Sequence, residues 1–345
     1  MPHAQTTLPA DAAPVLVEIV RGGMVESRHR ASAAVVDAHG QVVAAWGDIE
    51  QPIYGRSAIK PLLAIALVES GAADHFGLSE AEIALACASH NGEPRHVETV
   101  EAWLQRAGLG VDDLECGAHF PYHEPSLHAM IRSGEKPTRA FNNCSGKHAG
   151  FLSTAKFLGE PTRGYIQYEH PVQQRLLGIL EQMSGCELGD VPRGIDGCGI
   201  PVIAMPLGNT ALAMANMADP HHLPEARAAA CRRILQAMMA EPFMVAGSDR
   251  FCTQVMEVIR PKAAIKTGAE GVYCAALPQH GLGICIKAED GAGRACEVIM
   301  GRVLQHLGVI DDADYARLES VLQPPIKNWA GTVTGRIRPA AEGGF

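Results

Sequence analysis

The chain has 345 residues, of which 47% are apolar and 19% charged, and its formal net charge is −9. This composition is typical of a globular protein and excludes a disordered chain. The acidic balance and the lack of a Lys/Arg cluster argue against a nucleic-acid partner. The longest apolar run, residues 61–68, is far shorter than the ~20 residues that span a bilayer, so we expect no membrane partner either.

The first 12 residues contain neither a basic segment nor an apolar segment of the kind found in secretory signals. We therefore expect residues 1–12 to be a flexible tail and the protein to be cytoplasmic. Ten cysteines are scattered along the chain without a CxxC pair, which is typical of free thiols in a reducing compartment. Most of them are expected to be small core side chains.

The first predicted elements are strands. A β-branched, apolar run covers residues 15–20, and two further runs, 33–36 and 42–46, flank a turn tetrapeptide at residues 37–40. This spacing predicts a β-hairpin over residues 33–46.

The middle of the chain is predicted to be helical. Expected helices cover residues 58–70, 96–107, 171–184 and 224–240, and the first three of them end directly before a glycine.

Strand character returns late in the chain. Residues 271–277 and 282–287 flank a second turn, and a last helix is expected over residues 292–307. Both chain ends can therefore contribute to one antiparallel sheet, with a helical region inserted between them. We expect a single α/β (α+β) unit over residues 13–335, and alternating βαβα patterning, which would indicate a doubly wound parallel sheet, is absent. Its sheet part would cover about 13–50 and 255–335, and its helical part about 51–254.

The sharpest chemical signal is an SxxK pair, Ser57 and Lys60, at the start of the first predicted helix. Residues three apart share a helix face, so the hydroxyl and the amine can meet, and a neutral lysine can activate a serine as a nucleophile. The alternative is an ordinary helix N-cap, because SxxK is common by chance.

A second signal, Lys266-Thr267-Gly268, directly precedes the late strand. SxxK followed much later by KTG on a strand is the pattern of serine β-lactamases and penicillin-binding proteins. In that pattern Lys266 poises a hydroxyl, and Gly268 lets a substrate backbone approach closely. Taken alone, KTG is more often an ordinary turn that enters a strand.

Ser89, His90 and Asn91 follow an apolar run and end at an Asn-Gly turn. Polar residues at the end of an element often belong to functional sites. Ser89 can act as the second serine of the β-lactamase pattern, whose usual SDN form is missing here. A plain polar turn is the alternative.

Two glycine-containing segments, 142–148 and 194–199, carry candidate metal ligands. Cys144 and Lys147 are three residues apart, and Cys198 lies between two glycines. Thiolates bind zinc well, whereas a lysine amine binds a metal only after it loses its proton. Two buried cysteines beside a Gly-Lys turn remain the alternative, and a P-loop is excluded by the residues around the lysine.

The other polar groups have simpler interpretations. We expect His119, His123 and His128 to be surface histidines rather than a metal cluster. Residues 247–250 indicate a capped start of the helix that follows.

Taken together, the motifs resemble the asparaginase II family, the Rhizobium-type L-asparaginases, which share the serine β-lactamase fold. The resemblance covers roughly residues 15–323. It rests on five motifs in order, at residues 54–61, 88–93, 143–148, 196–199 and 266–271.

The resemblance implies two serine–lysine tandems. Ser57, the nucleophile, is paired with Lys60, and Ser89 is paired with Lys266. It further implies a homodimer and a zinc ion that helps to place the substrate more than to break the bond. The ligands of that zinc would be Cys144, Lys147 and Cys198, with Asp196 beside them. The chain departs from the family at residues 247–250, where relatives often have Gly-Thr-Gly-Arg.

The implied activity is hydrolysis of L-asparagine to L-aspartate and ammonia through an acyl-enzyme. The substrate is a zwitterion, so charge logic assigns its carboxylate to Arg56 and its ammonium to Asp196; Arg56 could instead lower nearby lysine pKa values. Further substrate-binding candidates are His90, Asn91 and Gly268.

Two alternatives remain open. A glutaminase or another serine amidohydrolase on the same fold is the first, because one methylene changes binding by only about 1–3 kcal/mol. A non-catalytic zinc or thiol sensor is the second, and it leaves SxxK and KTG unexplained.

Overall fold

The computed structural model describes residues 13–341, so the expected tail at residues 1–12 lies outside the described residues. The strands are β1 (Val15–Arg21), β2 (Met24–Asp37), β3 (Val42–Trp46), β4 (Pro52–Tyr54), β5 (Arg193–Ile195), β6 (Pro201–Pro206), β7 (Ala264–Gly268), β8 (Val272–Leu277), β9 (Leu282–Ala288), β10 (Pro325–Lys327) and β11 (Val333–Pro339). The α-helices are α1 (Lys60–Leu63), α2 (Ile65–Glu69), α3 (Ala72–His75), α4 (Glu80–Ala86), α5 (Pro94–Arg106), α6 (Glu124–Ser133), α7 (Ser145–Leu158), α8 (Pro171–Ser184), α9 (Leu207–Ala218), α10 (Glu225–Ala240), α11 (Pro242–Ala246), α12 (Phe251–Ile259), α13 (Gly293–His306) and α14 (Asp312–Leu322). Short 3₁₀ helices are η1 (Arg56–Ile59), η2 (Val111–Asp113) and η3 (Arg139–Phe141).

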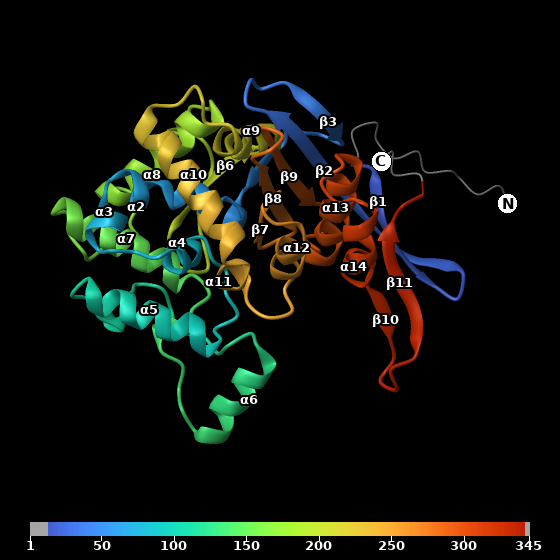
Figure 1. Ribbon diagram of the computed structural model, residues 1–345, viewed down its shortest axis with the longest axis horizontal. Coiled ribbons are helices and arrows are strands. Elements are labelled where there is room, and N and C mark those ends of the chain that lie inside the picture. Colours follow the sequence, from blue (N-terminus) through green and yellow to red (C-terminus); the bar gives the residue numbers. More distant parts are fainter. Residues whose placement is uncertain (1–12, 342–345) are drawn as a thin grey trace.

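The main sheet is antiparallel and combines strands from both ends of the chain, as expected from the sequence. Its order is β10-β11-β1-β2-β9-β8-β7, and β3 pairs with β2 beside this path. The central junction joins β2 to β9, with Ala34 opposite Cys285. Figure 1 shows the N-terminal strands in blue against the late strands in orange and red.

The first predicted hairpin forms, but β2 is longer than the sequence pattern indicates. β2 and β3 pair around the expected turn, where the Asp37 carboxylate accepts hydrogen bonds from the backbone of His39 and Gln41, each at 2.9 Å. Toward its start, β2 also forms a hairpin with β1. Exposed residues interrupt the alternation there, which is why the early half of β2 was not predicted.

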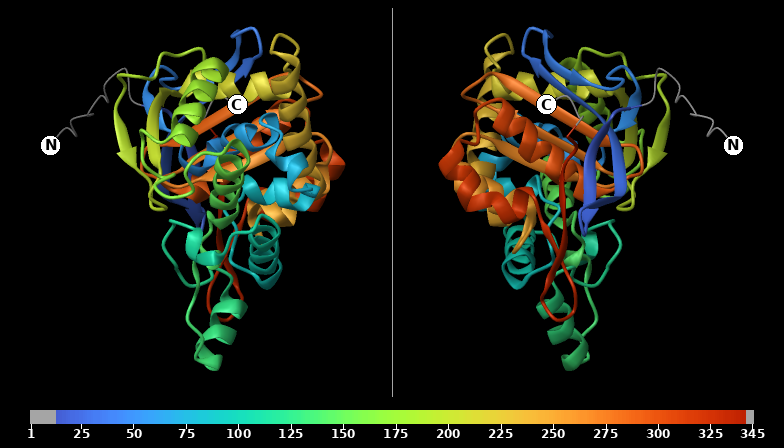
Figure 2. Two further views of the ribbon diagram at one scale, coloured as in Figure 1. Left: turned by 90° about the vertical axis from the view of Figure 1, so that its left-hand side faces the viewer. Right: turned by 90° about the vertical axis from the view of Figure 1, so that its right-hand side faces the viewer.

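Helices cover the sheet on both faces, and every residue of β8 is buried. α9 packs so closely on β9 that a Cβ added at Gly283 would lie 2.1 Å from the carbonyl oxygen of Ala211. α13 and α14 lie beside the sheet away from the helical middle of the chain (Figure 2). No helix in residues 13–341 is long and apolar enough to cross a membrane.

The first predicted helix, at residues 58–70, is interrupted. The chain forms η1, α1 and α2 in succession, and Pro61 lies in the first turn of α1. Proline has no backbone N–H to donate, so it cannot continue a preceding helical turn. The expectation of one continuous helix was therefore wrong, and Ser57 lies in the 3₁₀ turn before α1.

A second, smaller sheet positions residues that matter below. Its order is β4-β6-β5, so β6 holds the end of β4 and the end of β5 on its two sides. Arg56 follows β4 and Asp196 follows β5, although they are far apart in the sequence.

Candidate active site

The Ser57 turn begins in an unusual backbone conformation. Arg56 has φ = 47°, in the left-handed region that residues with side chains rarely adopt. Its guanidinium donates two hydrogen bonds to Oδ1 of Asp196, at 2.9 and 3.3 Å, and this ion pair holds the turn. Ser57 is partly exposed, and its hydroxyl has no hydrogen bond to any residue between 13 and 341. Strained backbone next to an available hydroxyl is typical of a functional site.

The KTG strand ends directly against this turn. A Cβ added at Gly268 would lie 3.0 Å from the backbone nitrogen of Ala58 and 3.2 Å from the carbonyl oxygen of Gly55. Glycine at this position therefore allows β7 and η1 to approach each other. The predicted role of Gly268 in a close approach to a substrate stays a prediction beside this approach between two segments of the chain.

Ser89 is the centre of a buried lysine network. Its hydroxyl accepts hydrogen bonds from Lys266 Nζ at 2.9 Å and from Lys60 Nζ at 3.0 Å. Lys60 also donates to the carbonyl oxygen of Ala88 at 2.5 Å and to Cys144 Sγ at 3.1 Å. The two lysines are essentially inaccessible, with exposed fractions of 1% for Lys60 and 0% for Lys266.

The structure thus brings together the two predicted tandems but connects them differently. In residues 13–341, Lys60 bonds to Ser89 and has no hydrogen bond to Ser57. Both lysines share Ser89, so Lys60, Ser89 and Lys266 form one connected group, and Ser57 is not hydrogen-bonded to it.

The network continues to the three predicted metal ligands. The Cys144 and Cys198 thiols share a hydrogen bond, and Lys147 Nζ lies 2.9 Å from Cys198 Sγ. All three side chains are buried. From Lys266 through Ser89, Lys60 and Cys144, contacts run without a break to this thiol pair.

Burial and neighbouring charges assign the protonation states. Burial lowers the pKa of Lys266 well below its usual value, and the charge of Lys60 adds to this effect. The hydrogen bond from Cys198 lowers the pKa of Cys144, as do the nearby lysines, although burial acts in the opposite direction. The same hydrogen bond, together with burial, raises the pKa of Cys198. Lys266 is therefore able to act as a neutral base, and Cys144 is the thiol of the pair that loses its proton more readily.

The cysteine–lysine trio fits a zinc ion in its donor types. Two neighbouring cysteine sulfurs, one of which has a lowered pKa, are ligands that zinc prefers. Burial tends to lower the pKa of Lys147, but the two sulfurs outweigh this and raise it, so zinc must displace the ammonium proton before the amine can bind. Across residues 13–341, no group of three or more His, Cys, Asp or Glu side chains could hold a metal, so His119, His123 and His128 form no such cluster.

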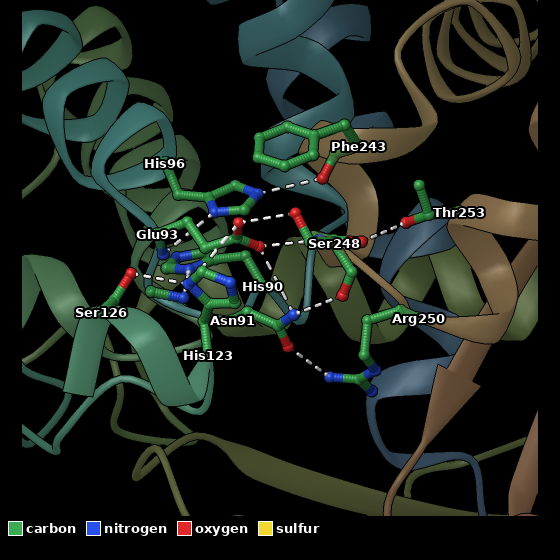
Figure 3. A network of polar contacts seen from close by, with 12 residues as sticks. His90, Asn91, Glu93, His96, His123, Ser126, Phe243, Ser248, Arg250 and Thr253 are labelled. Carbon is green, nitrogen blue, oxygen red and sulfur yellow. Dashed lines mark hydrogen bonds and ion pairs between the residues drawn. The ribbon is translucent and has the colours of Figure 1, made fainter. Parts of the chain in front are cut away.

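His90 and Asn91 are engaged by the protein itself. His90 accepts a hydrogen bond from the backbone of Gly92 at 3.0 Å, and its Nε2 lies 2.9 Å from the Ser145 hydroxyl. The side chain of Asn91 donates to the carbonyl oxygen of Ser248 and accepts from Arg250, as Figure 3 shows. Both side chains therefore hold neighbouring loops, and a role of His90 and Asn91 in substrate binding stays a prediction.

The segment at residues 247–250 is anchored in a way the sequence did not reveal. Glu93 accepts hydrogen bonds from the backbone nitrogen of Ser248 at 2.7 Å and from its hydroxyl at 2.8 Å (Figure 3). The residue that caps α12 is Arg250, and it makes no capping hydrogen bond through its side chain. The predicted capped start was wrong in this respect, because Ser248 binds Glu93 instead.

A small pocket adjoins the network. Four charged residues are among those that line it: Arg56, Lys60, Lys147 and Asp196. Its remaining walls are mostly apolar and come from α1, α8 and β6. The apolar residues of α8 have ordinary helical core spacing, and this pattern does not indicate that they face a pocket.

A mixed α/β fold with a buried serine–lysine network is typical of enzymes that cleave amides through a serine. The chain belongs to the L-asparaginase II family, whose model matches residues 17–339, and it is thus an amidohydrolase of the asparaginase type. The resemblance expected from the five motifs is confirmed.

Solved structures show weaker similarity. Mglu in its native form is 16% identical, with a TM-score of 0.45, and the match covers 83% of this chain and 67% of that one. A putative β-lactamase from Bacteroides dorei is 13% identical, with a TM-score of 0.40 and coverages of 75% and 84%. A β-lactamase from Sphaerobacter thermophilus is 12% identical, with a TM-score of 0.39 and coverages of 82% and 93%. No curated protein sequence matches the chain significantly.

Proposed function

We propose that this protein is an L-asparaginase that hydrolyses L-asparagine to L-aspartate and ammonia through an acyl-enzyme on Ser57. The observation that carries the proposal is the buried group of Ser89, Lys60 and Lys266 beside the available hydroxyl of Ser57. A lysine whose pKa is lowered by burial is a base at neutral pH, which a serine nucleophile needs.

The reaction follows from this arrangement. Ser57 Oγ attacks the side-chain amide carbon while its proton passes to the lysine–Ser89 network. Backbone N–H groups at Ser57 and near Gly268 stabilise the tetrahedral oxyanion, and such donors contribute about 3 kcal/mol each. The carbon–nitrogen bond then breaks, and ammonia leaves with a proton from the network. Water then hydrolyses the ester, with Ser89 and Lys266 relaying its protons, and Ser57 is freed.

The Arg56–Asp196 pair has the right charges for the zwitterionic end of asparagine. Asp196 uses Oδ1 to accept from Arg56 and from the backbone of Gly197 at 2.7 Å. Within residues 13–341, its Oδ2 and the Nη1 of Arg56 have no hydrogen-bond partner. We therefore assign the substrate ammonium to Asp196 and its carboxylate to Arg56.

Zinc, a homodimer and a cytoplasmic location complete the proposal. Cys144, Lys147 and Cys198 would hold the zinc, which supplies a fixed positive charge for orienting the substrate. A homodimer predicts twice the chain mass of 36.6 kDa in sedimentation equilibrium.

The test is ammonia release from L-asparagine by the purified protein and by its Ser57→Ala variant. Release should disappear in Ser57→Ala and persist in Ser126→Ala, which removes another half-buried hydroxyl, one bonded to His123. Ammonia release by a correctly folded Ser57→Ala protein would eliminate Ser57 as the nucleophile.

The same assay separates the alternatives. Faster release from L-glutamine than from L-asparagine would make the protein a glutaminase. Stoichiometric zinc with no hydrolysis of either amide would favour the sensor. The KTG strand against the Ser57 turn favours the asparaginase, because a sensor has no use for that contact.

A further inference from the structure

A second cavity lies where α12, α13 and α14 come together (Figure 1). It has a volume of about 300 Å³ and shares no lining residue with the small pocket beside the lysine network. Polar side chains supply five of its eight lining residues: Asp249, Arg250, Gln254, Glu297 and Ser320. Such a lining suits a small polar ligand, because a few convergent polar groups fix the orientation of what a cavity binds.

Two opposite charges, Arg250 and Glu297, line this cavity without pairing. Both are half-buried, and each is held by a residue outside the lining. Nη1 of Arg250 donates to Oδ1 of Asn91 at 2.9 Å (Figure 3), and Oε1 of Glu297 accepts from the Tyr273 hydroxyl at 2.8 Å. No ion pair joins Arg250 to Glu297 within residues 13–341, where Nε and Nη2 of Arg250 and Oε2 of Glu297 also have no hydrogen-bond partner. A cation and an anion in this arrangement can bind a ligand that carries both charges.

The surroundings of the two charges agree with such a ligand. Burial raises the pKa of the Glu297 carboxyl group, and the Tyr273 hydrogen bond and the charge of Arg250 offset this only in part. A ligand ammonium beside Oε2 would offset the remainder. At the other charge, α12 has Arg250 as its N-cap and no side-chain cap, so the N–H groups of its first turn favour a carboxylate near the guanidinium.

We propose that this cavity is a second binding site, which takes a free α-amino acid with its carboxylate at Arg250 and its ammonium at Glu297. A short, uncharged polar side chain fits best, because Asp249 would repel an acidic one and the Ser320 hydroxyl can bond to a polar one. L-asparagine meets both requirements. The binding does not rest on the proposed function, but its consequence for turnover does: the ligand would fix the guanidinium that bonds to Asn91, two residues after Ser89.

Calorimetric titration of Ser57→Ala with L-asparagine tests the proposal, because this variant is expected to bind without turnover. We expect two sites per chain in Ser57→Ala, and adding Glu297→Gln should weaken one of them at least about tenfold. Glutamine keeps an oxygen for the Tyr273 hydroxyl and removes only the charge, so the fold should persist.

The matched control is Glu181→Gln in the same background. It neutralises another half-buried carboxylate, one that accepts from the backbone nitrogen of Leu188 at 2.9 Å, and both sites should keep their affinity. Succinamic acid, which is asparagine without its ammonium, should bind the cavity at least about tenfold more weakly than L-asparagine does.

The outcomes separate this inference from the proposed function. Two sites with the expected pattern but no ammonia release by the wild type would overturn the asparaginase proposal and leave the cavity assignment standing. A single site that Glu297→Gln removes would support the cavity and contradict the placement of asparagine at Arg56 and Asp196. No binding of L-asparagine, or the same number of sites and the same affinities after Glu297→Gln, would overturn the cavity assignment.

Discussion

Ser89 is the residue on which the polar group depends, because one hydroxyl accepts from two buried lysines. Replacing it with alanine leaves two amines without this acceptor. We expect Ser89→Ala to lower kcat by about 10²-fold or more and to cost about 1–3 kcal/mol of stability. Steady-state kinetics and urea unfolding measure the two effects.

A matched control separates the catalytic part of this loss from the structural part. Ser153 is also buried, and its hydroxyl accepts a hydrogen bond from the Trp103 indole at 3.0 Å. This bond does not involve Lys60 or Lys266. Ser153→Ala should lose stability and keep its turnover. Equal activity losses in the two variants would mean that Ser89 has only a packing role.

Lys266 makes folding depend on pH in a definite direction. Burial lowers its folded-state pKa below the unfolded value of about 10.4, so between the two values the unfolded chain binds a proton that the folded chain does not. Stability therefore falls as the pH falls through this interval. Lys266→Met removes the cost, and we expect it to be inactive but more stable than the wild type at about pH 7, with the difference shrinking toward about pH 10.5.

Lys262 provides a contrast of opposite sign. Its hydrogen bond to Asp314 raises its pKa, so its contribution to stability is present below the unfolded pKa and is lost at higher pH. Lys262→Met should therefore destabilise slightly at neutral pH. Urea unfolding of both lysine variants at about pH 7 and about pH 10.5 tests these two predictions. If the wild type became more stable relative to Lys266→Met as the pH falls, the lowered pKa of Lys266 would be contradicted.

The candidate catalytic residues can be selected from the sequence, but their hydrogen-bond partners cannot. The SxxK pair, the KTG segment and the segment around Ser89 together indicate the two serines and two lysines of the candidate site. Lys60 bonds to Ser89 rather than to Ser57, because Ser89 follows α4 and lies beside Lys60 in the fold. Spacing along the sequence cannot predict a contact between such separate segments. Likewise, charge logic assigned Arg56 and Asp196 separately to the substrate, and their mutual ion pair arises only because β6 holds β4 beside β5.

At the scale of elements, the contact between β7 and η1 determines where Ser57, the proposed nucleophile, lies. A methyl group at position 268 would meet Ala58 and Gly55 at 3.0–3.2 Å, so one of the two elements must shift by a few tenths of an ångström. Gly268→Ala should lower kcat about tenfold or more with little loss of stability, because catalysis depends steeply on such distances.

Gly293 offers the matching control. A Cβ there has nothing within 4 Å, so Gly293→Ala should leave both kcat and the melting temperature nearly unchanged. Full activity in Gly268→Ala would show that the separation of the two elements does not limit the reaction.

Turn and cap chemistry accounts for which elements were predicted well. α8 begins at Pro171 and ends before Gly185, whose φ is 70°, so proline and glycine mark both of its ends. The break at Pro61 was missed because the apolar run continues across it. Hydrophobic pattern alone cannot distinguish one buried helix from two short ones.

At the scale of the whole molecule, zinc binding should stabilise the fold. A ligand that binds only the folded state raises stability in proportion to RT ln(1 + [L]/Kd), which is about 2.7 kcal/mol at a hundredfold excess over Kd. We expect added zinc to raise the melting temperature of the wild type, and to do so far less in Cys144→Ser or Cys198→Ser. Differential scanning calorimetry with metal analysis of the dialysed proteins provides the measurement.

Cys231 supplies the control for the zinc experiment. It is a buried free cysteine on α10, so Cys231→Ser tests the loss of a thiol as such. The zinc response should persist in this variant. An unchanged response in Cys144→Ser and Cys198→Ser would place any bound zinc elsewhere.

The pairing of β2 with β9 also has a consequence for how the protein is made. The ribosome releases β1 to β3 first, at about 5–20 residues per second, and the edge of β2 must wait for β9 before it is covered. Pairing over such a sequence distance is slow, and an uncovered strand edge is prone to aggregation. Lys266 and Gly268 also emerge late, so under the proposed mechanism a nascent chain gains activity only after most of it has been synthesised. Cellular yield should therefore depend on chaperones that protect the early strands during translation.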